Sequence, residues 1–289
     1  MRSKIGVIAV NGFLYLLALL FIAPLVFTVT NSFMSETEIH QNYSMVNSTN
    51  VSESGEINYA RLKLIPGMIT LKQYYTVLIK KTMFLAMFWK SVKLVVPIVL
   101  GQSAVASMAA YAFSRIDFPG REKFFYMYIV VMLMPFQVTL VPNYIIAGKL
   151  GLINNTLSII LPGIFSTFGV FLLRQFMEYI PDAYAEAARV EGAGHWAVFS
   201  KIILPMSKTG IAALMILIFI DNWNMVEQPL IFLQDASMQP LSVFLSEINA
   251  GERGIAFAAS VIYMVPMLLV FLYGEEYLVQ GIQLSGIKG

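Results

Sequence analysis

The 289-residue chain contains no cysteine, which excludes disulfides, thiolate metal sites and cysteine nucleophiles. Histidine is nearly as scarce: with only His40 and His195, there is little basis for a histidine metal site or a catalytic triad. Charged residues make up 12% of the chain, against about 25% in a typical soluble domain. The net charge of +2 comes without a basic stripe, so no nucleic-acid partner is expected.

What the chain has in abundance is apolar sequence, since 58% of its residues are hydrophobic. Crossing a bilayer takes about 20 helical residues, and runs of that length recur. No strand alternation typical of a barrel is present, so the sequence predicts an all-α integral membrane fold with six transmembrane helices. The fifth predicted span, Thr209–Leu233, is interrupted by Asp221 and Glu227. The predicted spans are Ile5–Thr30, Leu94–Phe113, Phe124–Gly148, Leu150–Leu173, Thr209–Leu233 and Gly254–Gly274.

The first 30 residues are predicted to be a retained helix, because their apolar stretch is too long for a signal peptide. Residues 31–88 form the one polar insertion, expected outside the cytoplasm. Its part Glu36–Asn58 is poor in apolar residues and is predicted to be loosely ordered. From Ile69 to Ile79, apolar residues at helical spacing predict an amphipathic helix. Basic residues in the short loops favour cytoplasmic N- and C-termini.

The charged interlude from Pro181 to Pro205 differs from the apolar sequence around it. Pro181 suits the first turn of a helix, and Asp182 suits its positive end. Four alanines in residues 183–188 make a strong helix with little bulk, which another surface can approach closely. Gly192 and Gly194 are expected to end it, with Gly192 in the left-handed conformation. His195 to Leu204 fit a second short helix, halted at Pro205.

The spacing within this interlude resembles a known motif. Glu186-Ala187-Ala188, three residues, Gly192, nine residues and then Ile202-x-Leu204-Pro205 are similar to the EAA loop of permease subunits in binding-protein-dependent ABC importers. In such families this loop sits in a groove of the cytoplasmic ATPase. The resemblance therefore implies a type-1 ABC importer transmembrane domain, expected over residues 89–281, with the coupling loop at 181–205.

Further segments are similar to sugar-importer permeases of the maltose type. They include Ala109–Arg115 with the following Phe118–Arg121, and the stretch from Trp223 to Leu230. The tail at residues 282–289 also resembles the family's ending and is expected to be cytoplasmic, and its last part, Ser285–Gly289, is expected to be small and flexible. The resemblance implies that this tail contacts the ATPase through Gly286, Lys288 and Gly289.

The chain has no Gly-x-x-x-x-Gly-Lys-Ser/Thr loop, so energy is expected from a separate protein. The resemblance implies a homologous second permease subunit, a cytoplasmic ATPase dimer that carries the ATP and Mg²⁺, and an extracytoplasmic solute-binding protein. No cofactor or metal is expected on this chain. Glu186 and Arg189 lie three apart on one face, where they would form a solvated pair. Alternatively, Glu186 meets a basic residue of the ATPase.

Polar residues inside spans are candidates for the transport pathway, because a carboxylate at membrane depth normally faces a cavity. Asp221 is placed about 18 Å along its predicted helix, near mid-membrane. Asn222, Trp223 and Asn224 beside it offer amides and an aromatic face suited to a sugar. Alternatively, Asp221 and Asn224 cap a helix break or pair with the partner subunit. Gln137 is a weaker candidate, beside an expected kink at Pro135.

The resulting prediction is a permease subunit, not an enzyme, that forms half of an import pathway for sugars or oligosaccharides. An importer permease for a non-sugar solute remains an alternative. A stand-alone channel or secondary transporter is a different class, which usually shows internal repeats or several charges within the membrane.

Overall fold

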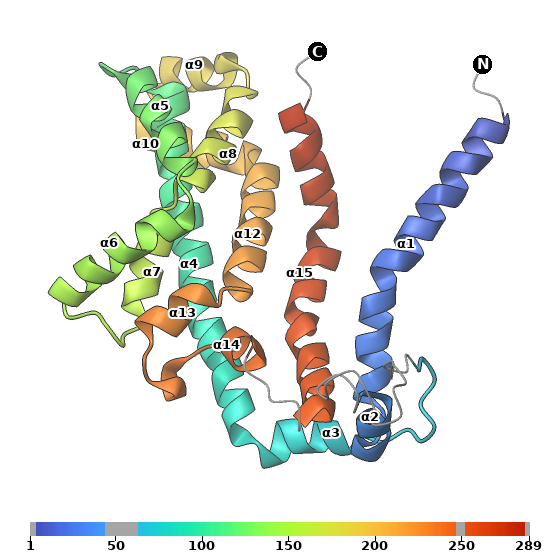
Figure 1. The fold of residues 1–289 in the computed structure, drawn as a ribbon. Helices are drawn as coiled ribbons and strands as arrows, with labels where there is room; N and C mark the ends of the chain where they lie inside the picture. Colours follow the sequence, from blue (N-terminus) through green and yellow to red (C-terminus); the bar gives the residue numbers. More distant parts are fainter. Residues whose placement is uncertain (1–3, 44–62, 247–251, 287–289) are drawn as a thin grey trace. The chain divides into compact units, whose positions relative to one another are not determined.

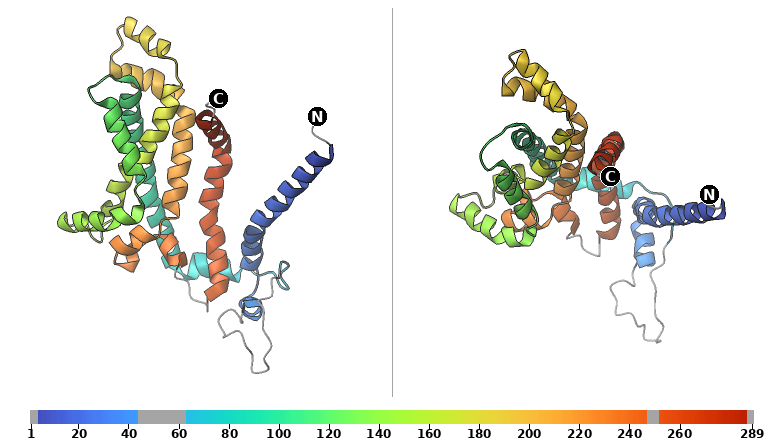
Figure 2. Two further views of the ribbon diagram at one scale, coloured as in Figure 1. Left: turned by 45° about the horizontal axis from the view of Figure 1, so that its top comes forward. Right: turned by 90° about the horizontal axis from the view of Figure 1, so that it is seen from above.

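The computed structural model describes residues 4–43, 63–246 and 252–286, and in these ranges the chain is helical with no strand. It divides into two compact units, residues 1–86 with 244–265 (unit 1) and residues 87–243 with 266–289 (unit 2). Figure 1 shows the course of the chain and Figure 2 gives two further views. Two long helices, α4 (Thr82–Arg115) and α15 (Arg253–Gly286), run from one unit into the other.

Unit 1 begins with α1 (Lys4–Ser32), an apolar helix that confirms the first predicted helix. None of its most apolar stretch is buried within the chain, as expected of a helix that faces lipid. The unit continues with short helices that are tied to one another. Ser32 Oγ and Tyr74 Oη lie 2.7 Å apart, and Lys81 Nζ lies 2.6 Å from Glu252 Oε1. The short elements are α2 (Glu36–Tyr43), α3 (Lys72–Tyr75) and the π-helical turn η2 (Thr76–Lys80).

Two predictions for this insertion are tested. The helical segment after Ile69 is confirmed as α3 and η2, with Gln73 and Val77 turned into the unit. The prediction of a loosely ordered Glu36–Asn58 is wrong for Glu36–Tyr43, because α2 buries Ile39 fully. Residues 44–62 lie outside the described residues.

Unit 2 holds the remaining elements around a core shared by α4, α8 and α12. In the helical order they are α5 (Arg121–Met132), α6 (Phe136–Lys149), α7 (Leu157–Ile164), α8 (Thr167–Glu178), α9 (Asp182–Val190), α10 (His195–Val198), η3 (Phe199–Ile203), α11 (Leu204–Met206), α12 (Lys208–Trp223), α13 (Glu227–Phe232), η4 (Ala236–Met238) and α14 (Leu241–Ser246), the last of which reaches into unit 1.

Small residues let the helices of unit 2 approach closely. In lipid no hydrophobic force drives helices together, so apolar helices associate through such close packing. A Cβ added at Gly101 of α4 would lie 2.7 Å from Ile164 Cγ1, and one at Gly169 of α8 would lie 3.0 Å from Ala106 Cβ. Both contacts are tighter than ordinary Cβ contacts, so a larger residue at either position needs its neighbour to shift. Figures 1 and 2 show α4, α8 and α12 side by side, with α9 at one end of the unit and α6 and α13 at the other.

The predicted spans need several corrections. Four helices in the described ranges are long and apolar enough to cross a membrane, or up to six if each bent pair is one span. The four are Gly6–Ser32, Thr82–Arg115, Leu157–Glu178 and Arg253–Val279. The predicted span Phe124–Gly148 is instead the pair α5 and α6, bent by 99° where Pro135 precedes α6. The predicted Leu150–Leu173 starts later, at Leu157, because Gly151 and Asn154 take left-handed turns with φ of 67° and 59°.

The predicted span Thr209–Leu233 is wrong at its end, because α12 stops at Trp223 and α13 follows as a separate helix. If α12 is part of a longer, bent span, the other half is the preceding segment His195–Met206, and the bend between the two is 74°. The prediction of a flexible Ser285–Gly289 is wrong for Ser285 and Gly286, since α15 runs to Gly286. Lys288 and Gly289 lie outside the described residues.

Candidate functional site

The first limb of the 181–205 segment is α9, which confirms the predicted short helix. Pro181 does not lie in its first turn as predicted but immediately before it, in the N-cap position with φ −57° and ψ 136°. Asp182 is the first helical residue, where a carboxylate meets the positive end of the helix dipole. Ala185 is the one buried residue of α9. The alanines thus make a slim helix that lies on the surface.

The end of α9 explains why Ala188 and Gly192 stand four residues apart. The Gly192 N–H donates to Arg189 O at 3.0 Å, and the Ala193 N–H donates to Ala188 O at 2.9 Å. These two bonds form the Schellman motif that satisfies the last carbonyls of a helix. The motif needs a left-handed residue at Gly192, and its φ of +86° confirms the predicted conformation.

The outward side of α9 carries the other residues of the motif. Glu186 and Ala187 are exposed and Ala188 is half-buried, while Val190 at the helix end is 89% exposed. The prediction that Glu186 pairs with Arg189 is not fulfilled, since no ion pair among the described residues joins them. Glu186 therefore lies exposed on α9 beside the small Ala187, while the larger Tyr184 and Arg189 are exposed on the same helix.

The second limb begins at Gly194 and packs inward more deeply. Val198, Phe199 and Ile203 are buried, Ile202 and Leu204 are half-buried, and Pro205 is exposed. The predicted stop at Pro205 is wrong, because the chain stays helical to Met206 and turns at Ser207. Pro205 has no N–H to donate, and a π-helical stretch precedes it in η3. We call the two limbs, residues 181–206, the elbow.

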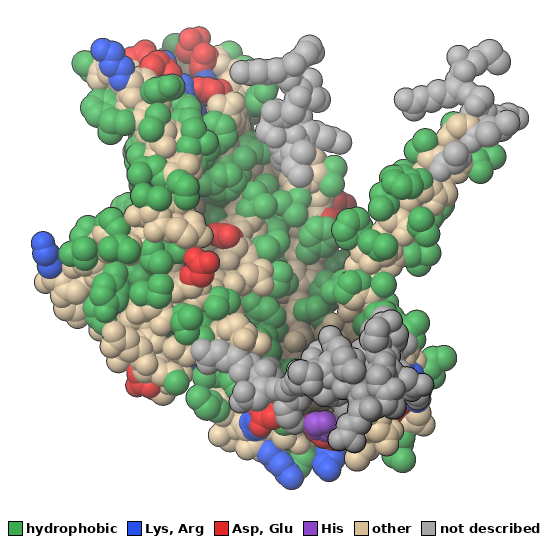
Figure 3. Space-filling view, in the orientation of Figure 1, with side chains coloured by type: hydrophobic (Ala, Val, Ile, Leu, Met, Phe, Trp, Pro, Cys, Tyr) green, Lys and Arg blue, Asp and Glu red, His purple; other side chains and the backbone are tan. Residues whose placement is uncertain are grey.

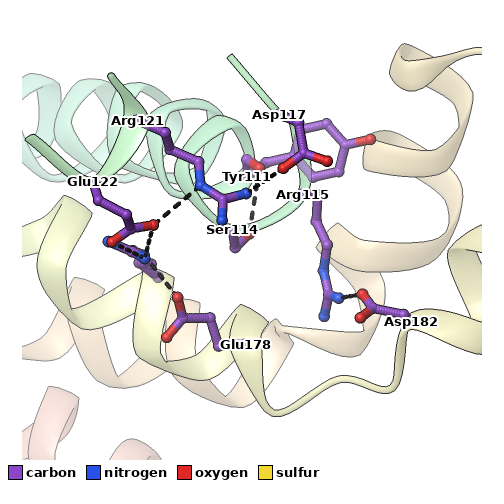
Figure 4. Close-up of polar contacts among 9 residues, drawn as sticks. Tyr111, Ser114, Arg115, Asp117, Arg121, Glu122, Glu178 and Asp182 are labelled. Atoms are coloured by element: carbon purple, nitrogen blue, oxygen red, sulfur yellow. Dashed lines mark hydrogen bonds and ion pairs between the residues drawn. The ribbon is translucent and has the colours of Figure 1, made fainter. Parts of the chain in front are cut away.

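Arg115, the last residue of α4, holds the first limb. Figure 4 shows its guanidinium directed at the Asp182 carboxylate. The other guanidinium nitrogen donates to the carbonyls of Met177 and Ile180, in the last turn of α8 and in the link to α9. Only 5% of the Arg115 side chain is exposed, whereas 75% of Asp182 is. A buried cation thus satisfies carbonyls that the end of α8 leaves open.

Arg174 of α8 forms a second, neighbouring cluster, and Figure 4 labels its partners Glu122 and Glu178. Its Nε lies 2.7 Å from Glu178 Oε1, and its Nη2 lies 3.0 and 3.1 Å from the two oxygens of Glu122 in α5. The guanidinium carbon also stands 3.7 Å from the centre of the Phe125 ring, a cation–π contact. These contacts fasten α8 to α5 directly behind the elbow.

The charged residues of this end of unit 2 form a band on its surface. On the face in Figure 3, acidic and basic side chains gather over the end where α5 and α9 lie, and the surface below is mostly apolar. Asp117, in the turn between α4 and α5, pairs with Arg121, the first residue of α5, with 2.8 Å between Oδ1 and Nη1. Such a distribution suits a helix end that leaves the hydrocarbon region.

The candidate pathway residues lie at the end of α12, not in the middle of a continuous helix. Asp221 is exposed in its last turn. The amides of Asn222 and Asn224 donate to Ile218 O and Ile220 O, each at 2.8 Å, so both complete the helix end. The structure thus shows the helix break of the alternative interpretation, while the role of Asp221 stays a prediction.

Trp223 does not fit the prediction that it lines a pathway. It is 1% exposed and packs between Phe88, at a ring separation of 5.6 Å, and Phe219, at 5.3 Å. Its indole is part of the core of unit 2. Gln137 is exposed in the first turn of α6, just after the 99° bend, and its role also stays a prediction.

The fold and the elbow together define a class: an integral membrane subunit with the type-1 ABC importer permease fold. Residues 93–283 match the family of binding-protein-dependent transport system inner membrane components, and the chain belongs to that family. It is therefore a transport component of the inner membrane and not an enzyme. Family membership also does not support the alternative of a stand-alone channel or secondary transporter.

Individual relatives agree with this placement. The chain is 30% identical to an arabinooligosaccharides transport system permease protein of Halalkalibacterium halodurans, over 78% of this chain and 81% of the relative. It is 26% identical over the whole of both chains to a polygalacturonan/rhamnogalacturonan transport system permease protein of Bacillus subtilis. An sn-glycerol-3-phosphate transport system permease protein of Pectobacterium atrosepticum is 32% identical, over 70% of this chain and 73% of the relative.

A solved structure shares the fold. It is a bacterial ABC transporter involved in the import of the acidic polysaccharide alginate, with a TM-score of 0.80 and 21% identity. The match covers 96% of this chain and 98% of that one.

Proposed function

We propose that this chain is a permease subunit of an ATP-driven importer for sugars or oligosaccharides, and that its elbow docks on a separate ATPase. One observation carries the docking proposal: α9 presents Glu186 and small alanines outward, on a helix fixed at both ends. A slim, rigid helix can enter a groove with little loss of side-chain entropy. The exposed carboxylate then meets a basic residue in a contact from which water is removed.

The partners follow from this role. A homologous second permease completes the pathway, an ATPase dimer binds ATP and Mg²⁺ on the cytoplasmic side, and a solute-binding protein delivers the solute from outside. The elbow end of unit 2, with the charged band, is then cytoplasmic, as are the N- and C-termini. The tail at Gly286, Lys288 and Gly289 reaches toward the ATPase, and Asp221 with its neighbouring amides lines part of the pathway.

The docking proposal is tested by Glu186→Lys in the full complex, expressed with its ATPase. The variant should lose most of the ATPase during purification, because like charges then meet across the contact. Glu227→Lys in α13 is the matched control, since it reverses an equally exposed carboxylate far along the chain from the elbow. A Glu186→Lys complex that keeps its full ATPase complement would show that α9 is not the docking helix.

The sugar proposal rests on relatives that are named for arabinooligosaccharides and for polygalacturonan or rhamnogalacturonan. A second candidate solute is sn-glycerol-3-phosphate, because the 32% identical relative is named for it. Uptake of labelled arabino-oligosaccharides, galacturonides and sn-glycerol-3-phosphate by cells with the complete importer separates the two. Uptake of glycerol phosphate alone would refute the sugar proposal and leave the docking proposal intact.

A further inference from the structure

The elbow is held by one face of a single helix. Arg115 in the last turn of α4 bonds Asp182 at the start of α9 and the carbonyls of Met177 and Ile180. Tyr111, one turn earlier, contacts the second limb. Its hydroxyl lies 3.4 Å from His195 Nδ1, and its ring centre lies 5.2 Å from that of Phe199. Residues four apart share one face of a helix, so the same side of α4 grips both limbs.

The Arg115 and Tyr111 contacts hold the two limbs of the elbow by different kinds of interaction. The Arg115 contact is a buried cation with three acceptors in residues 177–182, and it fixes direction because the guanidinium donors are planar. The Tyr111 contact is mainly ring packing, since Tyr111 and Phe199 are 5% and 6% exposed. One limb is therefore held by oriented hydrogen bonds and the other by close packing, and neither can slide along α4 without losing them.

The far part of α4 reaches the segment that ends α12. Phe88 packs on Trp223, and Ser91 Oγ accepts the Leu241 N–H at 2.9 Å. From Phe88 to Arg115 the helix measures about 40 Å at its usual rise. One continuous helix thus connects the elbow with the end of α12, where the candidate pathway residues lie.

From these contacts we infer that Tyr111 and Arg115 are positioning residues that clamp the elbow to α4, so that α4 moves with the elbow as one body. The inference rests on the proposed docking of the elbow, since the ATPase supplies the movement. Force applied to α9 then passes through the Asp182–Arg115 contact into α4. The clamp adds nothing to ATPase binding itself, because Arg115 is buried behind α9 and Glu186 faces outward.

The clamp is tested by electron paramagnetic resonance distances in the complex with its ATPase. The chain has no cysteine, so nitroxide labels at Val190→Cys in α9 and Met108→Cys in α4 are unambiguous when the other subunits carry no reactive cysteine. Both positions are exposed. With the clamp intact, the mean distance should change by less than about 2 Å between the nucleotide-free state and the state trapped with ATP and vanadate. A larger change of this distance in the labelled complex, with Tyr111 and Arg115 both in place, overturns the inference.

Variants then test the contact itself. Arg115→Met should widen the distance distribution about twofold, because α9 loses its tether to α4. Asp182→Ala removes an exposed side chain and leaves the buried carbonyl bonds, so it folds even where Arg115→Met does not, and it should widen the distribution about 1.5-fold. Asp117→Ala is the matched control, since its carboxylate pairs with Arg121 and not with the elbow. An unchanged width in Asp182→Ala overturns the clamp.

ATPase retention separates this inference from the docking proposal. Asp182→Ala should keep the ATPase bound, whereas Glu186→Lys should lose it. If Glu186→Lys keeps the ATPase, docking at α9 is wrong. If docking holds but Asp182→Ala leaves the distances as they were, only the clamp is wrong.

Discussion

Gly192 offers the sharpest test of how the elbow is built. Its φ of +86° places it in the left-handed region, where a residue with a Cβ is strained by about 1–2 kcal/mol. An added Cβ would meet no atom within 4 Å, so Gly192→Ala adds no clash and the strain is purely in the backbone. Reduced freedom of the unfolded chain offsets about 0.5 kcal/mol of it. The net loss of local stability is about 1 kcal/mol.

Gly194 is a close to ideal control, two residues further on. It is also exposed, and a Cβ there would also meet nothing within 4 Å. Its φ of −74° is one that alanine adopts readily. Gly194→Ala should therefore put no strain on the end of α9, although the substitution adds the same methyl group to the same elbow; any cost falls on α10, whose N-cap is Gly194.

Hydrogen–deuterium exchange of the peptide covering residues 182–194 measures the difference in the full-length protein. The two amides of the Schellman motif, Gly192 and Ala193, should exchange roughly fivefold faster in Gly192→Ala, which is the factor that corresponds to about 1 kcal/mol. Gly194→Ala should leave them unchanged. Equal exchange in both variants would refute the argument that a left-handed cap ends α9.

Three further predictions concern the rest of the chain. Trp223→Ala should lower the free energy of unfolding of the purified protein by about 3–5 kcal/mol, because a fully buried indole leaves a cavity; a loss below about 1 kcal/mol would show that the indole is not core. Arg174→Met should cost about 1–3 kcal/mol, since a buried guanidinium loses three hydrogen bonds, and it should unfold at a clearly lower temperature than Arg121→Met, because the Arg121 side chain is itself 29% exposed. The pKa of Glu38 lies below its ordinary value of 4.5 because Lys63 and the Gly67 N–H donate to its carboxylate. This stabilisation is complete above pH 4.5 and is lost as the pH falls through the lowered pKa, so Glu38→Gln should show less acid destabilisation than the wild type between pH 5 and pH 3 in circular dichroism melts.

The elbow was predictable from sequence because its signals are local. Asp182 at a helix start, alanines within it and Gly192 past its end each act within one turn of the chain, and α9 forms as they indicate. Pro205 misled the prediction of the second limb. A proline removes one hydrogen bond, which the chain accommodates by a π-helical stretch before it, and the helix ends only at Met206.

The sequence does interrupt the apolar run at Asp221, Asn224 and Glu227, but the predicted span continues past them because apolar residues resume at Leu230–Leu233. A tertiary contact also fixes the end of α12, because the Trp223 indole packs on Phe88 of α4, far away in the sequence. A possible local signal was the pair Asn222 and Asn224, since asparagine side chains compete for backbone groups at helix ends.

The supporting arginines were missed for a similar reason. Arg115 and Arg174 stand at the ends of apolar runs, where a cation usually reaches the interface and faces water. Here both side chains are buried, and their acidic partners are distant in sequence: Asp182 is 67 residues from Arg115, and Glu122 is 52 residues from Arg174. Partners at that separation leave no pattern in the local sequence.

Contact between α9 and the ATPase is the central claim, and site-specific photo-crosslinking tests it most directly. A photoreactive amino acid at Ala187, exposed on α9 beside Glu186, should join this chain to the ATPase in the assembled importer. The same group at Leu150, exposed at the end of α6, should not. A strong ATPase crosslink from Ala187 alone is the predicted result. An active importer in which Ala187 yields no ATPase crosslink, or in which Leu150 yields as much, would contradict the account.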